Sequence, residues 1–154
     1  CNIYLKYEGT PLMAYEYTKT LNDKYPKNLY FAVRHTEVLL ARGDYKEAER
    51  ISNQLFKSGK KYFVSISYVF YGLLYERFFK EPENASMFFT KAIQSFQETK
   101  NPDVDYLSFA YAGMGRYYKQ SGNKQKAREN YQKCKEITEY ISLLKEAETY
   151  LSTK

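Results

Sequence analysis

Residues 111–134 read YAGMGRYYKQSGNKQKARENYQKC, and this stretch decides the fold. Its two halves each contain a small residue, Gly115 and Ala127, and the pair Gly122 and Asn123 separates them. Glycine is favoured in the left-handed conformation that ends a helix, and asparagine is favoured at the cap that begins one. The stretch therefore predicts two helices that are joined by a short turn and that pack closely where their side chains are small.

The same pattern recurs at intervals of about 34 residues. A shift of 34 residues carries one spaced set onto the next, from Gly9, Ala14, Leu21 and Pro26 to Gly43, Ala48, Leu55 and Lys60, and it carries Leu5 onto Leu39. A third copy has one extra residue near Pro82 and holds the equivalent places with Gly72, Tyr75, Ala85, Phe89 and Ala92. A 34-residue period combined with helical patterning is typical of a helix–turn–helix repeat.

In the fourth copy the repeated positions are Met114, Gly115, Tyr118, Gly122, Ala127, Tyr131 and Cys134. With this spacing the chain resembles the tetratricopeptide-repeat (TPR) family over nearly all of its length, and Tyr111 stands where that family often has tryptophan. The resemblance implies an all-α fold, a right-handed superhelical α-solenoid of antiparallel helix pairs. It divides a single domain into a half repeat, three repeats and a capping extension, at 1–28, 29–62, 65–99, 108–141 and 142–154. His35 and Thr36 depart from the family pattern, and Pro26 alone remains of its repeat-end proline.

Periodicity and turn residues together predict helices over 11–24, 29–42, 45–58, 61–80, 83–99, 103–121 and 124–152. The last segment contains no Gly or Pro, so we expect one long helix that overruns the final repeat and caps the open end of the solenoid. Helix-ending glycines are expected at Gly43 and Gly122, and capping side chains at Asn28, Asp44 and Asn123.

The composition is that of an ordinary globular protein except for its aromatic content. Among 154 residues there are 18 Tyr and 10 Phe but no Trp. Tyrosine has an apolar body and a polar tip, so it suits surfaces that are partly buried and partly wet. Four Pro and seven Gly argue against a collagen-like or low-complexity chain. No stretch approaches about 18 uncharged apolar residues, so no membrane span is expected.

The two cysteines, Cys1 and Cys134, cannot form a disulfide framework, so the chain is not expected to be a small secreted scaffold. Cys1 is open to two interpretations, the lipid-modified first residue of a mature bacterial lipoprotein or the start of a fragment. The repeat register begins inside the first helix of a repeat, which favours a C-terminal segment of a longer chain; an irregular N-terminal cap over 1–8 is the alternative. The compartment stays open, with the cytoplasm slightly favoured over the bacterial periplasm.

No constellation typical of catalysis or of a cofactor site is found in the sequence. His35 is the only histidine, and it has no partner at a spacing that suits a catalytic triad or a metal site, so a packing role is expected. The glycines of 113–115 lie within an expected helix and lack the strand that precedes a phosphate-binding loop. Ser58 and Lys61 have the spacing of some acyl enzymes, but the companion motifs are absent. We therefore expect no enzyme, no metal and no cofactor.

In TPR proteins the first helix of each repeat lines a concave groove, and the resemblance implies that ligand contacts come from set positions of that helix. The partner-binding residues expected on this basis are Tyr30, Val33, Glu37, Ile66, Val69, Leu73, Phe109, Arg116 and Lys119. Val33, Glu37 and Val69 depart from the family's carboxylate clamp, so a chaperone tail of that type is not expected. An apolar centre with a basic end suits an extended or helical apolar segment that carries an acidic residue. The alternative is that 62–71 only packs against neighbouring helices.

The sequence thus predicts a protein-interaction scaffold that holds a partner peptide or helix in this groove. One alternative is a structural segment that packs against the rest of its own longer chain. Another is nucleic-acid binding by the basic run between residues 116 and 135, which holds seven Lys or Arg against Glu129. A solvated helix face is favoured over nucleic-acid binding for this run, because helical spacing spreads the charges around the helix. The oligomeric state stays open.

Overall fold

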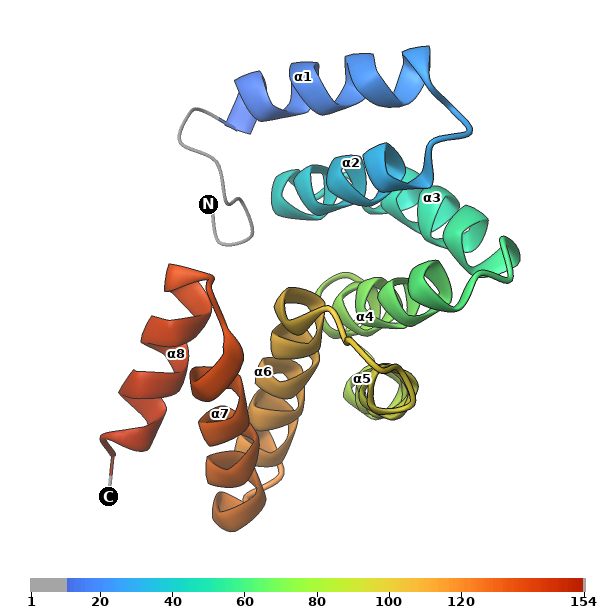
Figure 1. Cartoon of the computed structure of the whole chain (residues 1–154). Helices are drawn as coiled ribbons and strands as arrows, with labels where there is room; N and C mark the ends of the chain where they lie inside the picture. Colours follow the sequence, from blue (N-terminus) through green and yellow to red (C-terminus); the bar gives the residue numbers. More distant parts are fainter. Residues whose placement is uncertain (1–10, 154) are drawn as a thin grey trace.

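A computed structural model describes residues 11–153, which form helices connected by short turns (Figure 1). Within these residues there are eight α-helices: α1 (Pro11–Lys24), α2 (Leu29–Arg42), α3 (Tyr45–Lys57), α4 (Lys61–Arg77), α5 (Pro82–Gln97), α6 (Val104–Gln120), α7 (Lys124–Ile137) and α8 (Ile141–Leu151). The predicted repeat positions Leu5 and Gly9, the two interpretations of Cys1 and the alternative cap over 1–8 lie outside the described residues.

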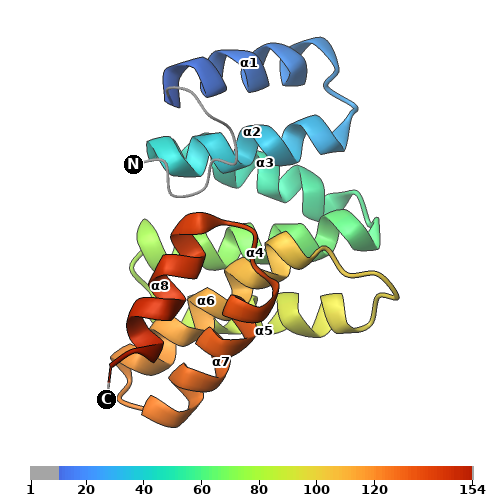
Figure 2. The same cartoon turned by 60° about the vertical axis from the view of Figure 1, so that its left-hand side comes forward.

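The helices are arranged as a stack of antiparallel pairs. Each helix contacts the next one in sequence, and α2, α4, α6 and α8 also form a second series in which each contacts the next. Figures 1 and 2 show the pairs α2–α3, α4–α5 and α6–α7 following one another with a progressive rotation. This is the all-α repeat solenoid that the sequence predicts.

Turn residues end and begin the helices largely as predicted. Gly43 and Gly122 adopt left-handed conformations, with φ of 83° and 82°. Gly43 directly follows the end of α2, and Gly122 lies two residues after the end of α6. The side chains of Asn28 and Asn123 accept hydrogen bonds from main-chain N–H groups in the first turns of α2 and α7. Local chemistry alone therefore determines where these helices stop and start.

Two helix ends differ from the prediction. Asp44 precedes α3 but makes no capping hydrogen bond. Its carboxylate instead pairs with the guanidinium of Arg42 at 3.1 Å. The helix expected to reach residue 80 ends at Arg77, because Lys80 takes a left-handed conformation (φ 57°) that lets the N–H of Glu81 reach back to the α4 backbone.

The expected single helix over 124–152 is wrong, because the chain breaks between α7 and α8. Thr138 is extended (φ −77°, ψ 138°), and its hydroxyl accepts a hydrogen bond from the N–H of Tyr140 at 3.2 Å. The break turns the chain so that Tyr140 is buried against Phe109 of α6, with ring centroids 4.7 Å apart. Burial of this ring and of Leu143 and Ala147 in α8 favours the bent path over a straight helix with an apolar face in water.

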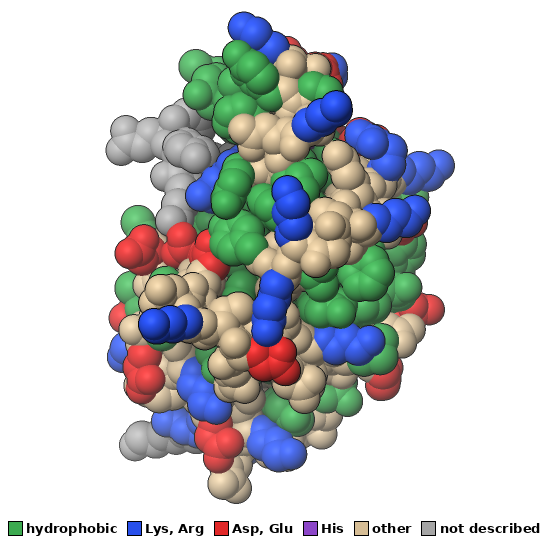
Figure 3. Space-filling view, turned by 45° about the vertical axis from the view of Figure 1, so that its right-hand side comes forward, with side chains coloured by type: hydrophobic (Ala, Val, Ile, Leu, Met, Phe, Trp, Pro, Cys, Tyr) green, Lys and Arg blue, Asp and Glu red, His purple; other side chains and the backbone are tan. Residues whose placement is uncertain are grey.

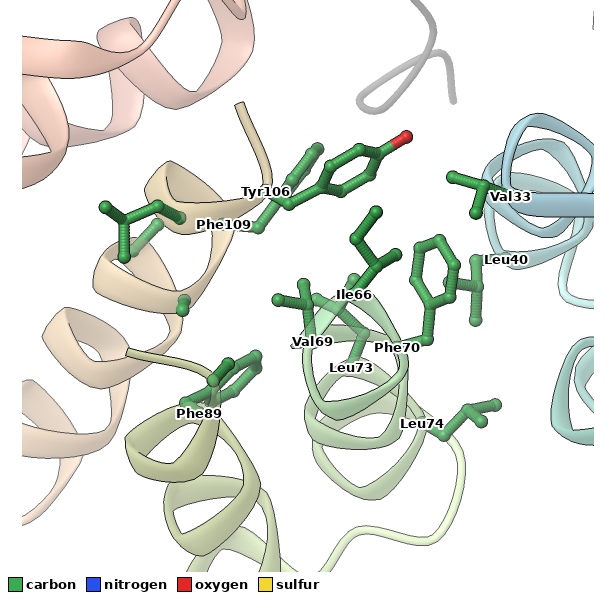
Figure 4. Packing of buried hydrophobic residues seen from close by; sticks show 14 of the residues in the cluster. Val33, Leu40, Ile66, Val69, Phe70, Leu73, Leu74, Phe89, Tyr106 and Phe109 are labelled. Carbon is green, nitrogen blue, oxygen red and sulfur yellow. The ribbon is translucent and has the colours of Figure 1, made fainter. Parts of the chain in front are cut away.

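Close approach of the helices depends on small residues, as the sequence predicts. The ring of Phe89 from α5 lies in a slot between Gly72 of α4 and Gly113 of α6. Gly115 lies against the ring of Tyr131 in α7, where a Cβ atom would come within 2.8 Å of the ring. Figure 4 shows Phe89 beside the buried face of α4, within an apolar core that runs from α2 to α8. The repeated glycines are therefore packing positions.

Candidate partner-binding groove

Six of the nine predicted groove residues are buried. These residues are at most 4% exposed: Val33, Glu37, Ile66, Val69, Leu73 and Phe109. Figure 4 shows Val69 on the side of α4 that faces α6, and Phe70 on the side that faces α2. A buried side chain cannot contact a partner unless the helices separate. The structure therefore corrects the prediction for five of these residues, all but Val33, which lines a hollow described below, and it favours the packing alternative for 62–71.

A polar contact between α2 and α6 accompanies this burial. The hydroxyl of Tyr106 donates a hydrogen bond to the carboxylate of Glu37, which also accepts one from Arg34 at 3.1 Å. Burial, reinforced by the nearby Glu37 charge, raises the pKa of Tyr106 well above its ordinary value. The phenol therefore stays protonated and acts as the donor, which satisfies a carboxylate that is itself almost without solvent.

Arg116, the predicted basic end of the groove, is already occupied by two carboxylates. Its guanidinium donates to Glu76 of α4 at 2.8 Å and to Glu146 of α8 at 2.9 Å. Tyr131 donates to the same Glu146 at 2.9 Å. Burial disfavours the charge, but the attraction of Glu76 and Glu146 outweighs it and raises the pKa of Arg116. The prediction that Arg116 receives an acidic partner residue is corrected, because this arginine joins α4, α6 and α8.

Tyr30 and Lys119 are the two predicted residues that remain exposed. Tyr30 is 61% exposed and lines two hollows near the turn between α1 and α2. The inner hollow, of about 310 Å³, is lined by Tyr17, Thr18, Leu21, Tyr30, Phe31, Val33, Arg34, Tyr62 and Tyr106. The outer hollow, of about 670 Å³, is lined by Tyr25, Pro26, Lys27, Asn28, Leu29, Tyr30, Lys60 and Phe63. We call these two hollows together the Tyr30 groove.

Neighbouring rings hold Tyr30 in place. Its ring meets that of Phe63 edge-on at 5.0 Å and that of Tyr62 at 5.6 Å. Tyr62 in turn donates a hydrogen bond to Asp103 at 2.9 Å, and Asp103 caps α6. Burial is the main cause that raises the pKa of Tyr62, with Asp103 adding to it. An exposed aromatic ring is thereby supported by elements from three successive repeats.

The local sequence explains why Tyr30 is presented to solvent. α1 ends at Lys24, because Pro26 disfavours the helical conformation for the residue before it, Tyr25. Asn28 then caps α2 by accepting a hydrogen bond from the N–H of Tyr30 at 3.0 Å. Tyr30 is consequently the second residue of its helix, a position where the side chain projects beyond the packed helix pair.

Of the residues that line the groove, only Tyr30 and Val33 belong to the predicted set; the tyrosines Tyr17 and Tyr62 do not. Tyr62 is the second residue of α4, just as Tyr30 is the second residue of α2, so the helix register carried a signal for it. Tyr17 lies on α1 and is 68% exposed. Nothing in the sequence connects it to the first turns of α2 and α4, because only the packing of α1 on α2 brings it there.

The groove is basic as well as aromatic. Lys27, Lys60 and Arg34 belong to the lining, and among the lining residues of both hollows in the described part of the chain there is no Asp or Glu. Figure 3 turns this side of the molecule forward and shows hydrophobic side chains bordered by Lys and Arg. The next lysine along α4, Lys61, is paired with Glu98 at 3.1 Å. The potential in the groove therefore attracts anionic groups.

The basic run of α7 is dispersed over the helix surface. Arg128 donates to the carbonyl groups of Leu151 and Thr153 at the end of α8. Lys126 lies over the ring of Tyr118 and Lys133 over that of Tyr111, at 5.3 and 5.6 Å from the ring centroids. These basic side chains already contact carbonyl groups and aromatic rings of the protein itself. Their contacts favour an ordinary helix surface over a nucleic-acid-binding site.

The family model for the tetratricopeptide repeat matches residues 63–139, which is half of the chain. The chain belongs to the tetratricopeptide-repeat family. Comparison with curated proteins and with solved structures found no match. TPR domains generally mediate protein–protein interactions, and the TPR is typically a non-enzymatic scaffold fold.

Among residues 11–153, none of the helices has the length and apolar character that crossing a membrane requires. The same residues contain no group of three or more His, Cys, Asp or Glu side chains that could hold a metal ion. His35 is buried and shares a hydrogen bond of 2.9 Å with the hydroxyl of Thr18, which joins α2 to α1.

Proposed function

We propose that this TPR protein is an interaction module whose partner binds at the Tyr30 groove. The observation that carries the proposal is that Tyr30 is 61% exposed and lines two hollows rich in aromatic side chains. Exposed, rigidly supported tyrosine rings provide large contact area at a low cost in side-chain entropy, and such aromatic anchors dominate the affinity of protein interfaces.

The rest of the predicted concave face is not available in the same way. At its C-terminal end α8 packs on α6, with Tyr140 against Phe109 and Glu146 bound to Arg116. A partner there would have to displace buried apolar surface and a partly buried ion pair. The N-terminal part of the face offers Tyr30 without such a cost, so partner binding is proposed there.

A second candidate function is structural, in which the chain packs against a further part of its own protein. The observation in its favour is on α1, where Leu12, Met13 and Tyr17 are 61%, 66% and 68% exposed. Exposed apolar side chains on one helix suit contact with another helix. This candidate predicts that the covering segment reaches Tyr17 and therefore shields the inner hollow of the Tyr30 groove.

The test maps where selected peptides bind. A random peptide library is selected against the protein, and the backbone amide signals are followed by NMR as each enriched peptide is added. We expect the largest shifts in the turn between α1 and α2 and in the first turn of α4. The variant Tyr30→Ala should lose binding. Tyr45→Ala is the matched control, since Tyr45 is an exposed tyrosine on α3 that does not line the groove.

Shifts confined to other surfaces, such as the outward faces of α3 and α5, would contradict the proposal. So would peptides that bind Tyr30→Ala as tightly as the unaltered protein. A soluble paramagnetic probe, added to the full chain without peptide, reports which signals are exposed. Groove signals that the probe does not weaken would favour the structural alternative.

A further inference from the structure

We infer that the Tyr30 groove recognises an extended, proline-containing segment flanked by acidic residues. This inference rests on the proposed function and specifies its partner. It is carried by three features of the groove, which are its two-hollow shape, its tyrosine hydroxyl groups and its charge.

The shape favours an extended segment with bulk at regular intervals. The inner and outer hollows are neighbours that share one lining residue, Tyr30. A polyproline II segment rises about 3.1 Å per residue with three residues per turn, so equivalent side chains recur about every 9 Å along one edge. Such a segment can place one apolar residue in each hollow while its backbone crosses the ring. Aromatic-lined grooves are the surfaces on which Pro-rich segments dock.

Hydrogen bonding also favours this conformation over a helix. A polyproline II backbone has no internal hydrogen bonds, so its carbonyl groups need donors. Tyr17 and Tyr30 carry phenolic groups at strongly exposed positions of the lining, and each can donate one. A helical partner has satisfied nearly all of its own carbonyl groups and would leave these donors to water. The rigidity of the segment further lowers the entropy lost on binding.

The charge of the groove selects the flanking residues. Lys27 and Lys60 line the outer hollow, and neither hollow has a carboxylate among its described lining residues. The carboxylates that contact lining residues are engaged, since Glu37 accepts hydrogen bonds from Arg34 and Tyr106, and Asp103 accepts one from Tyr62. The chain as a whole has a net charge of +6. Acidic residues beside the proline core are therefore attracted, and basic ones are repelled.

The test uses labelled synthetic peptides of about twelve residues, and fluorescence anisotropy gives their dissociation constants. One peptide has a core of Pro and Leu with two Glu at each end. A second replaces every Pro by Ala, which favours a helix, and a third replaces every Glu by Lys. We expect the first to bind most tightly, and Tyr30→Ala to weaken it by about tenfold or more, as for the loss of an aromatic anchor. Tyr45→Ala should leave it unchanged.

Charge reversal supplies the second arm. The double variant Lys27→Glu and Lys60→Glu should weaken the Glu-flanked peptide and strengthen the Lys-flanked one. Raising the salt concentration from about 50 to 200 mM should reduce the difference between the two peptides in the unaltered protein.

The outcomes separate the inference from the proposed function. If the Ala peptide binds as well as the Pro peptide and both depend on Tyr30, the groove is a binding site and the extended conformation is refuted. If the selected library peptides map to the groove but contain neither proline nor acidic residues, the inference is again overturned while the proposed function holds. If Tyr30→Ala affects no peptide, both are overturned.

Discussion

Replacing Gly72 by alanine should destabilise the protein, although alanine is the better helix former. A Cβ atom at this position would lie 2.5, 2.6 and 2.9 Å from three ring carbons of Phe89. The ring cannot move away, because its other side lies against Gly113 of α6. A Cβ atom added at Gly113 would come within 2.4 Å of the ring. Forcing a ring that is held on both sides out of this slot costs about 2–3 kcal/mol, in the upper part of the range for overpacking, against about 1 kcal/mol gained in helix propensity.

The net loss expected for Gly72→Ala is therefore about 1–2 kcal/mol, which lowers Tm by roughly 2–8 °C in a domain of this size. Urea denaturation followed by far-ultraviolet circular dichroism measures the free energy of unfolding directly. The matched background is Phe89→Leu, which removes the ring edge that meets Gly72. In that background the alanine should be neutral or should stabilise the protein by up to about 1 kcal/mol.

The double-mutant cycle gives the coupling between the two sites, which we expect to be about 1–3 kcal/mol. A Gly72→Ala variant that is as stable as the unaltered protein would refute the reasoning. The same conclusion would follow if alanine at position 72 cost as much beside leucine as beside phenylalanine, because the cost would then come from some other contact.

Three further predictions concern ionisable groups. Glu146→Gln should break the ion pair that joins α8 to Arg116, at a cost of about 1–3 kcal/mol since the pair is partly exposed, and amide hydrogen exchange should accelerate in α8; unchanged exchange would contradict this role. Burial lowers the pKa of His35, so the unfolded chain takes up a proton at higher pH than the folded one. The free energy of unfolding should therefore fall as the pH drops below about 6.5. His35→Gln, which keeps a partner for Thr18, should flatten this dependence in urea denaturation. Burial raises the pKa of Cys134 to about 12, so its thiol should resist thiol reagents in the folded protein, and stability should decline as the pH rises above about 9, where the unfolded thiol ionises; rapid labelling without unfolding would count against its burial.

Much of the fold could be predicted from sequence because its signals are local. Gly43 ends α2 in a left-handed conformation, and Asn28 caps it. Both effects depend on one or two residues and their own backbone, so they do not require knowledge of the rest of the chain. The 34-residue spacing adds a second local rule, since it predicts which small residues meet at each helix crossing.

The break between α7 and α8 had no comparable local signal. No Gly or Pro lies between Lys124 and Leu151, so the sequence reads as one helix. The bent path is stabilised by contacts between residues that are distant in sequence, in which Tyr140 packs on Phe109 and Glu146 binds Arg116. A sum of non-local contacts outweighed a helical propensity that varies by less than about 1 kcal/mol per residue for most residue types.

The candidate site divides along the same line. Local sequence was sufficient to predict the repeat, the helix pairs, most caps and the place of Tyr30 in the first turn of α2. The burial of Val69 and Leu73, the ion pairs of Arg116 and the gathering of Tyr17 and Tyr62 with Tyr30 around two hollows depend on contacts between helices. Capping and periodicity are set within a few residues, whereas burial depends on how closely neighbouring helices approach across the stack.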